Sequence, residues 1–207
     1  MNKKQQQSEE TKRRIAEAAK ALFMQKGYRS TSIEDIVEAT GSSKGNIYYH
    51  FKSKEGLFLH LIEEWDMEWL EKWNSKEHQF ATTADKLFGM AEQLVRDDLN
   101  HPFTKALDEF ITNNEASTED ASQRIAEIIQ KRLAFNQHLL RQGIESGEFE
   151  NHNITHLAFI FESLIGGLSQ MSRMTQVADA LPIYHSAIQM LLHGIAKNNV
   201  WPISPSP

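Results

Sequence analysis

The 207-residue chain contains no cysteine, which excludes disulfide bonds and cysteine-ligated metal sites and fits a reducing compartment. No apolar run approaches the length needed to span a bilayer, and the polar start of the chain lacks the apolar stretch of a secretion signal. We therefore expect a soluble cytoplasmic protein. Three of the five prolines fall in residues 200–207, so this tail is not expected to continue a helix.

Motifs of several catalytic and metal-binding classes are also missing. The chain has no phosphate-binding glycine loop and no serine elbow of the hydrolase type. His152 and His156 have the four-residue spacing of paired metal ligands, but His152 falls in an expected loop and no carboxylate completes the set. We predict no catalytic residue, no metal and no cofactor.

The net charge of −6 at first argues against nucleic acid as a partner, but the charge is unevenly distributed. Residues 1–60 hold 11 Lys and Arg against 7 Asp and Glu, whereas the remainder holds 11 against 21. Because charges more than about 10 Å apart are largely screened at ordinary salt, a basic end can still bind phosphates. An acidic body should weaken nonspecific binding and make the affinity strongly salt-dependent.

The basic end begins with two predicted helices. Between Thr11 and Lys26, apolar residues recur with the three- and four-residue spacing of an amphipathic helix, and Gly27 ends it. Thr31 or Ser32 can cap a second helix, and Glu34 could close a capping box with Thr31.

A tight turn at Gly41-Ser42 leads into a third predicted helix, at about residues 43–50. Ile47 and Phe51 share one face and should be buried. This leaves an amide and two aromatic hydroxyls on the opposite face, beside several cations, which suits contact with phosphates and base edges. Two helices joined in this way form a helix-turn-helix, whose second helix enters the major groove. The alternative is an ordinary surface on a small helical domain.

These residues resemble the N-terminal pattern of the TetR family of bacterial repressors, which the chain follows at residues 27–28, 31–33, 36, 41–51, 54–55 and 57–58. The match covers roughly Thr11 to Trp73, and beyond it only the order of helices is similar. The resemblance implies a homodimer, a palindromic double-stranded DNA operator, and release of DNA when a small molecule binds the C-terminal domain.

On this interpretation, one set of side chains contacts base edges and a second set holds phosphates or shapes the turn. The first set is Lys44, Gly45, Asn46 and Tyr48. The second set is Thr31, Ser32, Ser42, Ser43, Tyr49, His50 and Lys54.

Helical periodicity continues to the end of the chain, so we predict an all-α fold of about nine helices. We expect a DNA-binding domain at 1–58, an effector-binding and dimerisation domain at 59–199, and a flexible tail at 200–207. The later helices are expected at 53–74, 84–100, 103–114, 118–146, 154–174 and 181–197.

The last two predicted helices carry broad apolar stripes, and Gly166-Gly167 permits close helix approach. Paired across a two-fold axis, they could form a four-helix dimer interface. The alternative is that both stripes pack inward, since core and interface stripes look alike. The interface candidates are Phe161, Leu164, Leu168, Met171, Ile188, Leu191, Leu192 and Ile195.

The effector site is predicted mainly from the resemblance. Asp66 and Trp69 fall where multidrug-binding members of the family place an acid and an aromatic ring against cationic drugs, which implies a hydrophobic effector, cationic in those members. The alternative is that the tryptophans are core and the acids are solvated. The candidates are Trp65, Asp66, Trp69, Trp73, Phe110, Phe135, Phe161 and Glu162.

Two other functions remain open at this point. The acidic body could dock a protein partner instead of a small molecule, or the helical body could hold an enzyme site. Neither has a motif of its own in the sequence.

Overall fold

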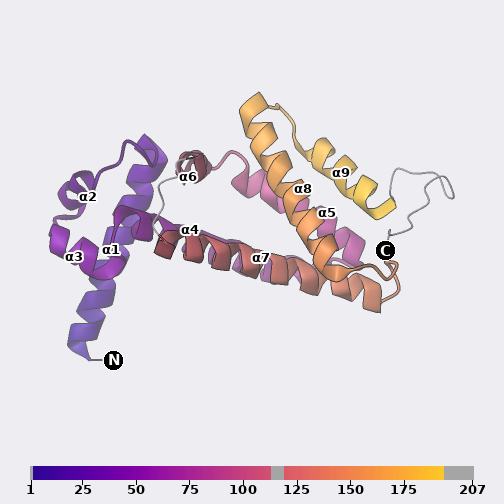
Figure 1. Cartoon of the computed structure of the whole chain (residues 1–207), viewed down its shortest axis with the longest axis horizontal. Helices are drawn as coiled ribbons and strands as arrows, with labels where there is room; N and C mark the ends of the chain where they lie inside the picture. The colour runs from indigo at the N-terminus through magenta and orange to yellow at the C-terminus, as the bar shows by residue number, and fades with distance from the viewer. Residues whose placement is uncertain (1, 113–118, 194–207) are drawn as a thin grey trace. The chain divides into compact units, whose positions relative to one another are not determined.

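The computed structural model describes residues 2–112 and 119–193, which are helical and contain no strand (Figure 1). The predicted all-α class is therefore confirmed. The helices are α1 (Lys3–Lys26), α2 (Ile33–Thr40), α3 (Lys44–Phe51), α4 (Lys54–Lys76), α5 (Thr83–Gln93), α6 (Pro102–Thr112), α7 (Glu119–Glu145), α8 (Ile154–Thr175) and α9 (Leu181–His193). Ile195, the predicted helix end at Lys197 and the tail at 200–207 lie outside the described residues.

Two predicted helix bounds are wrong. Helix α1 begins at Lys3, eight residues before the predicted start, because Asn2 and Gln5 form a capping box there. The helix predicted over 84–100 ends as an α-helix at Gln93, and a π-helical turn follows at Leu94–Asp98. Asp97 and Asp98 lie at the C-terminal end of this predicted helix. Acidic side chains there oppose the helix dipole, which disfavours continuation of the regular α-helix.

The chain forms two compact units, which are described separately. One comprises Met1–Lys76 and Asp97–Lys131, and the other comprises Glu77–Arg96 and Arg132–Pro207. The predicted boundary after residue 58 separates a DNA-binding part from an effector-binding part, and it does not coincide with the boundaries of the compact units. It stays a prediction.

The first unit is organised around a cluster of aromatic rings. Phe23 of α1 packs edge-on against Phe58 of α4 with ring centroids 4.9 Å apart, and Tyr28 lies 4.8 Å from the same ring. Phe103 and Phe110 of α6 lie 5.1 Å and 5.0 Å from Phe58. Burial of one large apolar side chain contributes roughly 1.5–3 kcal/mol, so this cluster holds α1, α4 and α6 together.

Helix α2 is capped by Ser32, and the alternative cap, Thr31 with Glu34, is wrong. The Ser32 hydroxyl accepts a hydrogen bond from the Asp35 amide at 3.0 Å, and the Asp35 carboxylate accepts one from the Ser32 amide at 2.7 Å. Thr31 is instead fully buried, and its hydroxyl donates to the Gly27 carbonyl at 2.8 Å. The helix ends at Thr40, with the left-handed Gly41 as its C-cap, as predicted.

In the second unit, α9 packs against α5 and α8. The Glu148 carboxylate, in the turn after α7, accepts hydrogen bonds from the Thr83 amide at 2.7 Å and the Ala84 amide at 3.3 Å. A carboxylate at this end of α5 neutralises free amides and complements the helix dipole. The buried core of the unit includes Leu87, Phe161, Tyr184 and Ile188.

The capping box can be tested by double-mutant cycles on the free energy of unfolding. Ser32→Ala should destabilise the protein by about 0.5–2 kcal/mol, because an N-cap is lost. Ser32→Ala and Asp35→Ala should show a coupling energy of about 0.5 kcal/mol or more, measured by urea denaturation. Ser32→Ala and Glu34→Ala should be additive within about 0.5 kcal/mol, and the opposite pattern would restore Glu34 as the capping partner.

Candidate nucleic-acid interface

Helix α3 is fixed in rotation by two buried side chains. Its N-cap is Ser43, whose hydroxyl accepts a hydrogen bond from the Asn46 amide at 3.2 Å. Ile47 is fully buried and Phe51 is 4% exposed, as the helical spacing predicts. The opposite face of α3 must therefore point away from the core.

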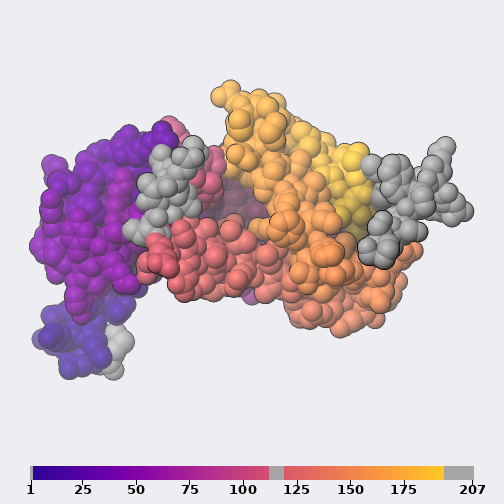
Figure 2. All heavy atoms as spheres, in the orientation of Figure 1, coloured from indigo at the N-terminus to yellow at the C-terminus, as the bar shows by residue number. Residues whose placement is uncertain are grey.

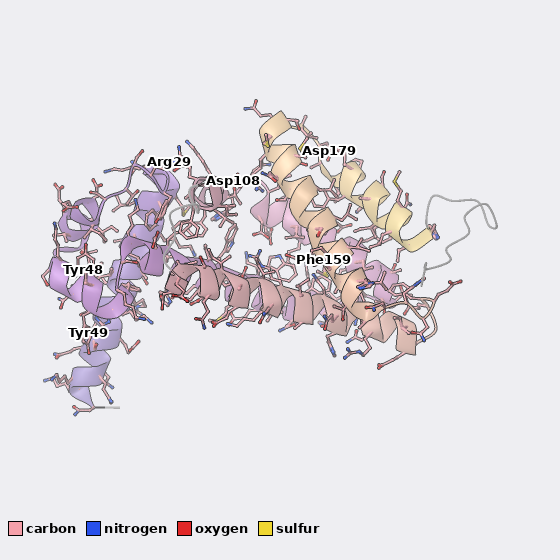
Figure 3. All side chains as sticks on the ribbon, in the orientation of Figure 1. Arg29, Tyr48, Tyr49, Asp108, Phe159 and Asp179 are labelled. Atoms are coloured by element: carbon pink, nitrogen blue, oxygen red, sulfur yellow. The ribbon has the colours of Figure 1, made fainter. Side chains whose placement is uncertain are left out.

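That opposite face carries large aromatic side chains in solvent. Tyr48 is 47% exposed and Tyr49 is 77% exposed, and both point outward from α3 (Figure 3). Lys44, Gly45 and Asn46 are exposed beside them. Because apolar surface left in water contributes nothing to folding, these tyrosines fit a surface that another molecule covers.

Gly45 has no structural reason to be glycine. A Cβ added there would meet only the Ser43 hydroxyl, at an ordinary contact distance of 3.6 Å. Glycine inside a helix costs about 0.5–1 kcal/mol relative to alanine, so the fold alone would favour a larger residue. A missing side chain at this position lets a partner approach the backbone of α3.

The predicted DNA-binding domain at residues 1–58, called the head below, holds its cations in different ways. Lys44 forms an exposed ion pair with Glu34 of α2, and its hydrogen bond lowers the pKa of the Glu34 carboxyl. The Lys54 ammonium lies 4.3 Å from the centroid of the Tyr28 ring, and burial lowers its pKa. Lys44 can therefore exchange Glu34 for a phosphate or base, whereas Lys54 is partly committed to packing.

The structure buries two of the predicted DNA contacts, Thr31 and Ser42, whereas Ser32 is half-buried and its role stays a prediction. Thr31 is fully buried, so its side chain cannot reach a phosphate in this structure. Ser42 is 4% exposed, and its hydroxyl accepts a hydrogen bond from Arg14 Nη2 at 3.3 Å. The Ser32 hydroxyl donates to the Asp35 carboxylate at 2.6 Å. Arg14, which was not among the predicted DNA contacts, therefore reaches the turn through Ser42, and its only signal in the sequence is its place in the basic run Lys12–Arg14.

The predicted effector residues divide between the two units. In the first unit, Trp65 packs edge-on against Phe103 at 5.2 Å, and Trp69 stacks on Trp73 at 6.1 Å with an interplanar angle of 8°. Trp73 is fully buried, and Phe110 belongs to the aromatic cluster at 4% exposure. Trp73 therefore serves packing, as the alternative interpretation held for the tryptophans, and Phe110 serves packing as well. Asp66 is half-buried on α4.

The second unit holds the remaining effector candidates. The Glu162 carboxylate on α8 accepts a hydrogen bond from Asn136 Nδ2 of α7 at 2.8 Å, and Asn136 is buried. Phe135 is half-buried and Phe161 is buried. A carboxylate fixed by a buried amide could orient a cation, but the two groups of candidates form no single described site.

The predicted dimer stripe on α8 and α9 stays a prediction, and burial contradicts it for two of its residues. Phe161 and Ile188 are buried within the unit and cannot face a partner. Leu164, Leu168, Leu191 and Leu192 are half-buried, and Met171 is 57% exposed. The large apolar side chains that face solvent on these two helices are Phe159, Ile160, Met171, Met174, Ile183 and Met190.

Two helices joined by a left-handed Gly41, with an aromatic and cationic face of the second helix in solvent, define a helix-turn-helix DNA-binding protein. The family model for bacterial regulatory proteins of the tetR family matches residues 15–61, and that for the C-terminal region of QacR-like proteins matches residues 65–197. The chain therefore belongs to the TetR family of bacterial regulatory proteins.

Individual relatives agree with this assignment. The HTH-type transcriptional regulator QacR of Staphylococcus aureus is 26% identical over 186 residues, which are 90% of this chain and 98% of QacR. The structure of FadR from Bacillus subtilis in complex with stearoyl-CoA has a TM-score of 0.72 at 24% identity, covering 88% of this chain and 98% of FadR. A putative transcriptional regulator from Saccharomonospora viridis, in complex with choline, has a TM-score of 0.72 at 21% identity, covering 91% and 99%.

The protein is thus a transcriptional regulator and not an enzyme. Among the helices that the structure describes, none is both long and apolar enough to cross a bilayer.

Gly45→Ala should separate stability from DNA binding. The added methyl group should leave the free energy of unfolding unchanged or raise it by up to about 1 kcal/mol. The same methyl should weaken DNA binding by about tenfold or more, because it occupies the space into which a base edge or phosphate would come. Thermal denaturation and gel-shift titration of one preparation measure both effects, and unchanged affinity would remove Gly45 from the interface.

Proposed function

We propose that the protein is a homodimeric repressor that binds a palindromic operator through α3 of each copy and releases it when a small hydrophobic molecule binds. The outward face of α3 is the observation that carries the proposal. Lys44, Gly45, Asn46 and Tyr48 contact base edges, where a good bidentate contact discriminates by about 1–3 kcal/mol. The contacts to phosphates come from Ser43, Tyr49 and His50.

A second copy of the chain supplies the second DNA-binding domain that a palindromic operator requires. The bare apolar face of α8 and α9 supports this part of the proposal, because stable protein interfaces usually bury about 1,200–2,000 Å² with an apolar centre. Gly166 and Gly167 lie on the same side of α8, and a Cβ at either would meet no atom within 4 Å. Small residues at this point allow two copies of α8 to cross closely.

The effector proposal rests on two chemical features. Within the second unit, the Glu162 carboxylate held by Asn136 suits the cationic group of an effector, and the half-buried Phe135 of the same unit is an aromatic ring that suits its hydrophobic part. Relatives of the same fold were crystallised with stearoyl-CoA and with choline, which are an acyl thioester and a quaternary ammonium. We therefore propose a hydrophobic effector. Whether the effector carries a positive or a negative charge is left to the experiment.

The first unit contains the contact through which an effector signal reaches the head. The Glu109 carboxylate of α6 accepts a hydrogen bond from the Arg29 amide at 3.0 Å, in the turn between α1 and α2. This carboxylate lies where residue 27 would otherwise carry a Cβ, 2.6 Å from the ideal position. A shift of α6 therefore moves the α1–α2 turn, and a coupling of about 1–3 kcal/mol is typical of such switches.

The role of α3 is tested by gel-shift titration with the gene's own upstream DNA at several salt concentrations. Lys44→Ala and Tyr48→Ala should each weaken saturable binding by about tenfold or more, a loss of about 1.4 kcal/mol or more. Lys105→Ala, which removes the same charge from an exposed position on α6, should change affinity little. Equal affinity of all three variants and the wild type would overturn the assignment.

The same titration tests release. A long-chain alkylammonium salt and a long-chain acyl-CoA are added separately to the preformed complex, and release by either supports a hydrophobic effector. If neither releases DNA while a bound protein partner does, the acidic body acts by protein docking instead.

Met171→Glu should disrupt the dimer, because it places two charges opposite each other in an apolar interface. Sedimentation velocity should show a monomer, and operator binding should fall with it, since one head makes too few contacts. Met67→Glu is a matched control, because Met67 on α4 is 60% exposed against 57% for Met171. A Met171→Glu protein that remains dimeric would rule out this face of α8.

A further inference from the structure

Helix α1 extends well beyond the part of the chain that matches the family model, which begins at residue 15. The helix starts at Lys3, and none of residues 2–14 is buried. In the space-filling view, the first turns of α1 stand clear of the rest of the first unit (Figure 2). The extension therefore adds nothing to the core.

Packing does not explain why this extension is helical. Isolated helices of about 12 residues are marginal in water, and most helical stability in proteins comes from an apolar face packed on a core. A helix that is polar on all sides either bridges between domains through solvent or is stabilised by i,i+4 pairs such as Arg13 with Glu17, and here the Asn2 capping box adds to them. The distribution of charge around the extension indicates what kind of surface it can meet.

The charges of the extension are segregated around the helix. At about 100° per residue, one arc of about 100° holds three cations and two neutral polar residues and no acid. These residues are Lys3, Lys4, Gln7, Thr11 and Arg14. The adjoining arc carries the acids Glu9, Glu10 and Glu17, together with Arg13, which pairs with Glu17 at 3.6 Å. The remaining cation, Lys12, lies in neither arc. Burial lowers the pKa of the His60 imidazole of α4, and Lys12 is close enough to lower that pKa further.

Arg14 fixes the direction in which the basic arc points. Its Nη2 donates to the Ser42 hydroxyl at 3.3 Å, one residue before the N-cap of α3. The basic arc therefore runs outward from the start of the recognition helix. Twelve residues at 1.5 Å each span about 18 Å, which corresponds to about five base pairs of backbone at 3.4 Å per step.

We propose that the arc formed by Lys3, Lys4, Gln7, Thr11 and Arg14 binds backbone phosphates of the DNA that flanks the segment read by α3. The inference rests on the proposed function and adds a second, sequence-independent contact surface to it. The occupant is duplex DNA because the arc is cationic, free of acids and continuous with the α3 interface. The acids Glu9, Glu10 and Glu17 lie on the adjoining arc, where Glu17 pairs with Arg13.

The test compares two full-length variants that each remove one exposed cation from the extension. Lys4→Gln removes a charge from the basic arc, and Arg13→Gln removes one from the other side of the same helix. Affinity for a footprinted site in the gene's own upstream DNA is measured from 50 to 200 mM salt. Lys4→Gln should make the slope of log K against log salt shallower by about 0.9 per lost contact, and so by close to two per dimer. Arg13→Gln should leave the slope near that of the wild type.

The length of the DNA gives a second readout. Shortening the flanks to the α3-read segment should weaken wild-type and Arg13→Gln binding, whereas a Lys3→Gln, Lys4→Gln double variant should be much less sensitive to it. Equal slopes and equal flank dependence for all variants would overturn the inference while leaving the regulator assignment intact. If the wild type itself shows no saturable binding to upstream or genomic DNA, the proposed function fails, and this inference fails with it.

Discussion

The burial of Ile47 and Phe51 is the constraint on which the DNA-binding surface depends. An eight-residue helix has little stability of its own, so its rotation is set by these two anchors and by the Ser43 cap. Once they are fixed, Tyr48 and Tyr49 have no place in the core and must face solvent. The proposed interface therefore follows from how α3 is held, and weakening either anchor would loosen the orientation of this face without altering any residue proposed to contact DNA.

Much of the fold followed from the sequence because helical periodicity and caps are local signals. The buried pair in α3 and the left-handed Gly41 are of this kind. The start of α1 was missed because residues 3–10 are polar throughout and carry no apolar period. The cap of α2 was ambiguous because Thr31 and Ser32 are both good caps, and only the depth of the Thr31 hydroxyl in the core decides between them.

A functional surface could be predicted from the sequence only where polar or cationic residues and exposed positions follow the same helical spacing, as they do on α3. On α8, the apolar pattern is broad enough that the sequence cannot say which edge is core, and the structure buries Phe161 while leaving Phe159 in solvent. The effector candidates come from segments far apart in the chain, and Trp73 and Phe110 turned out to be packing residues. Aromatic residues near an acid are therefore a weak signal, because a core uses the same side chains as a ligand pocket.

The fit of the Glu109 carboxylate over Gly27 has a consequence for the modularity of the protein. The head ends early in the sequence, yet one of its turns is completed by a side chain from α6, 80 residues further on. A chimera that joins this head to the body of another regulator would inherit a hole above Gly27 unless α6 were transplanted with it. In this protein, an exchange of the body therefore has to keep the Glu109 carboxylate together with Gly27.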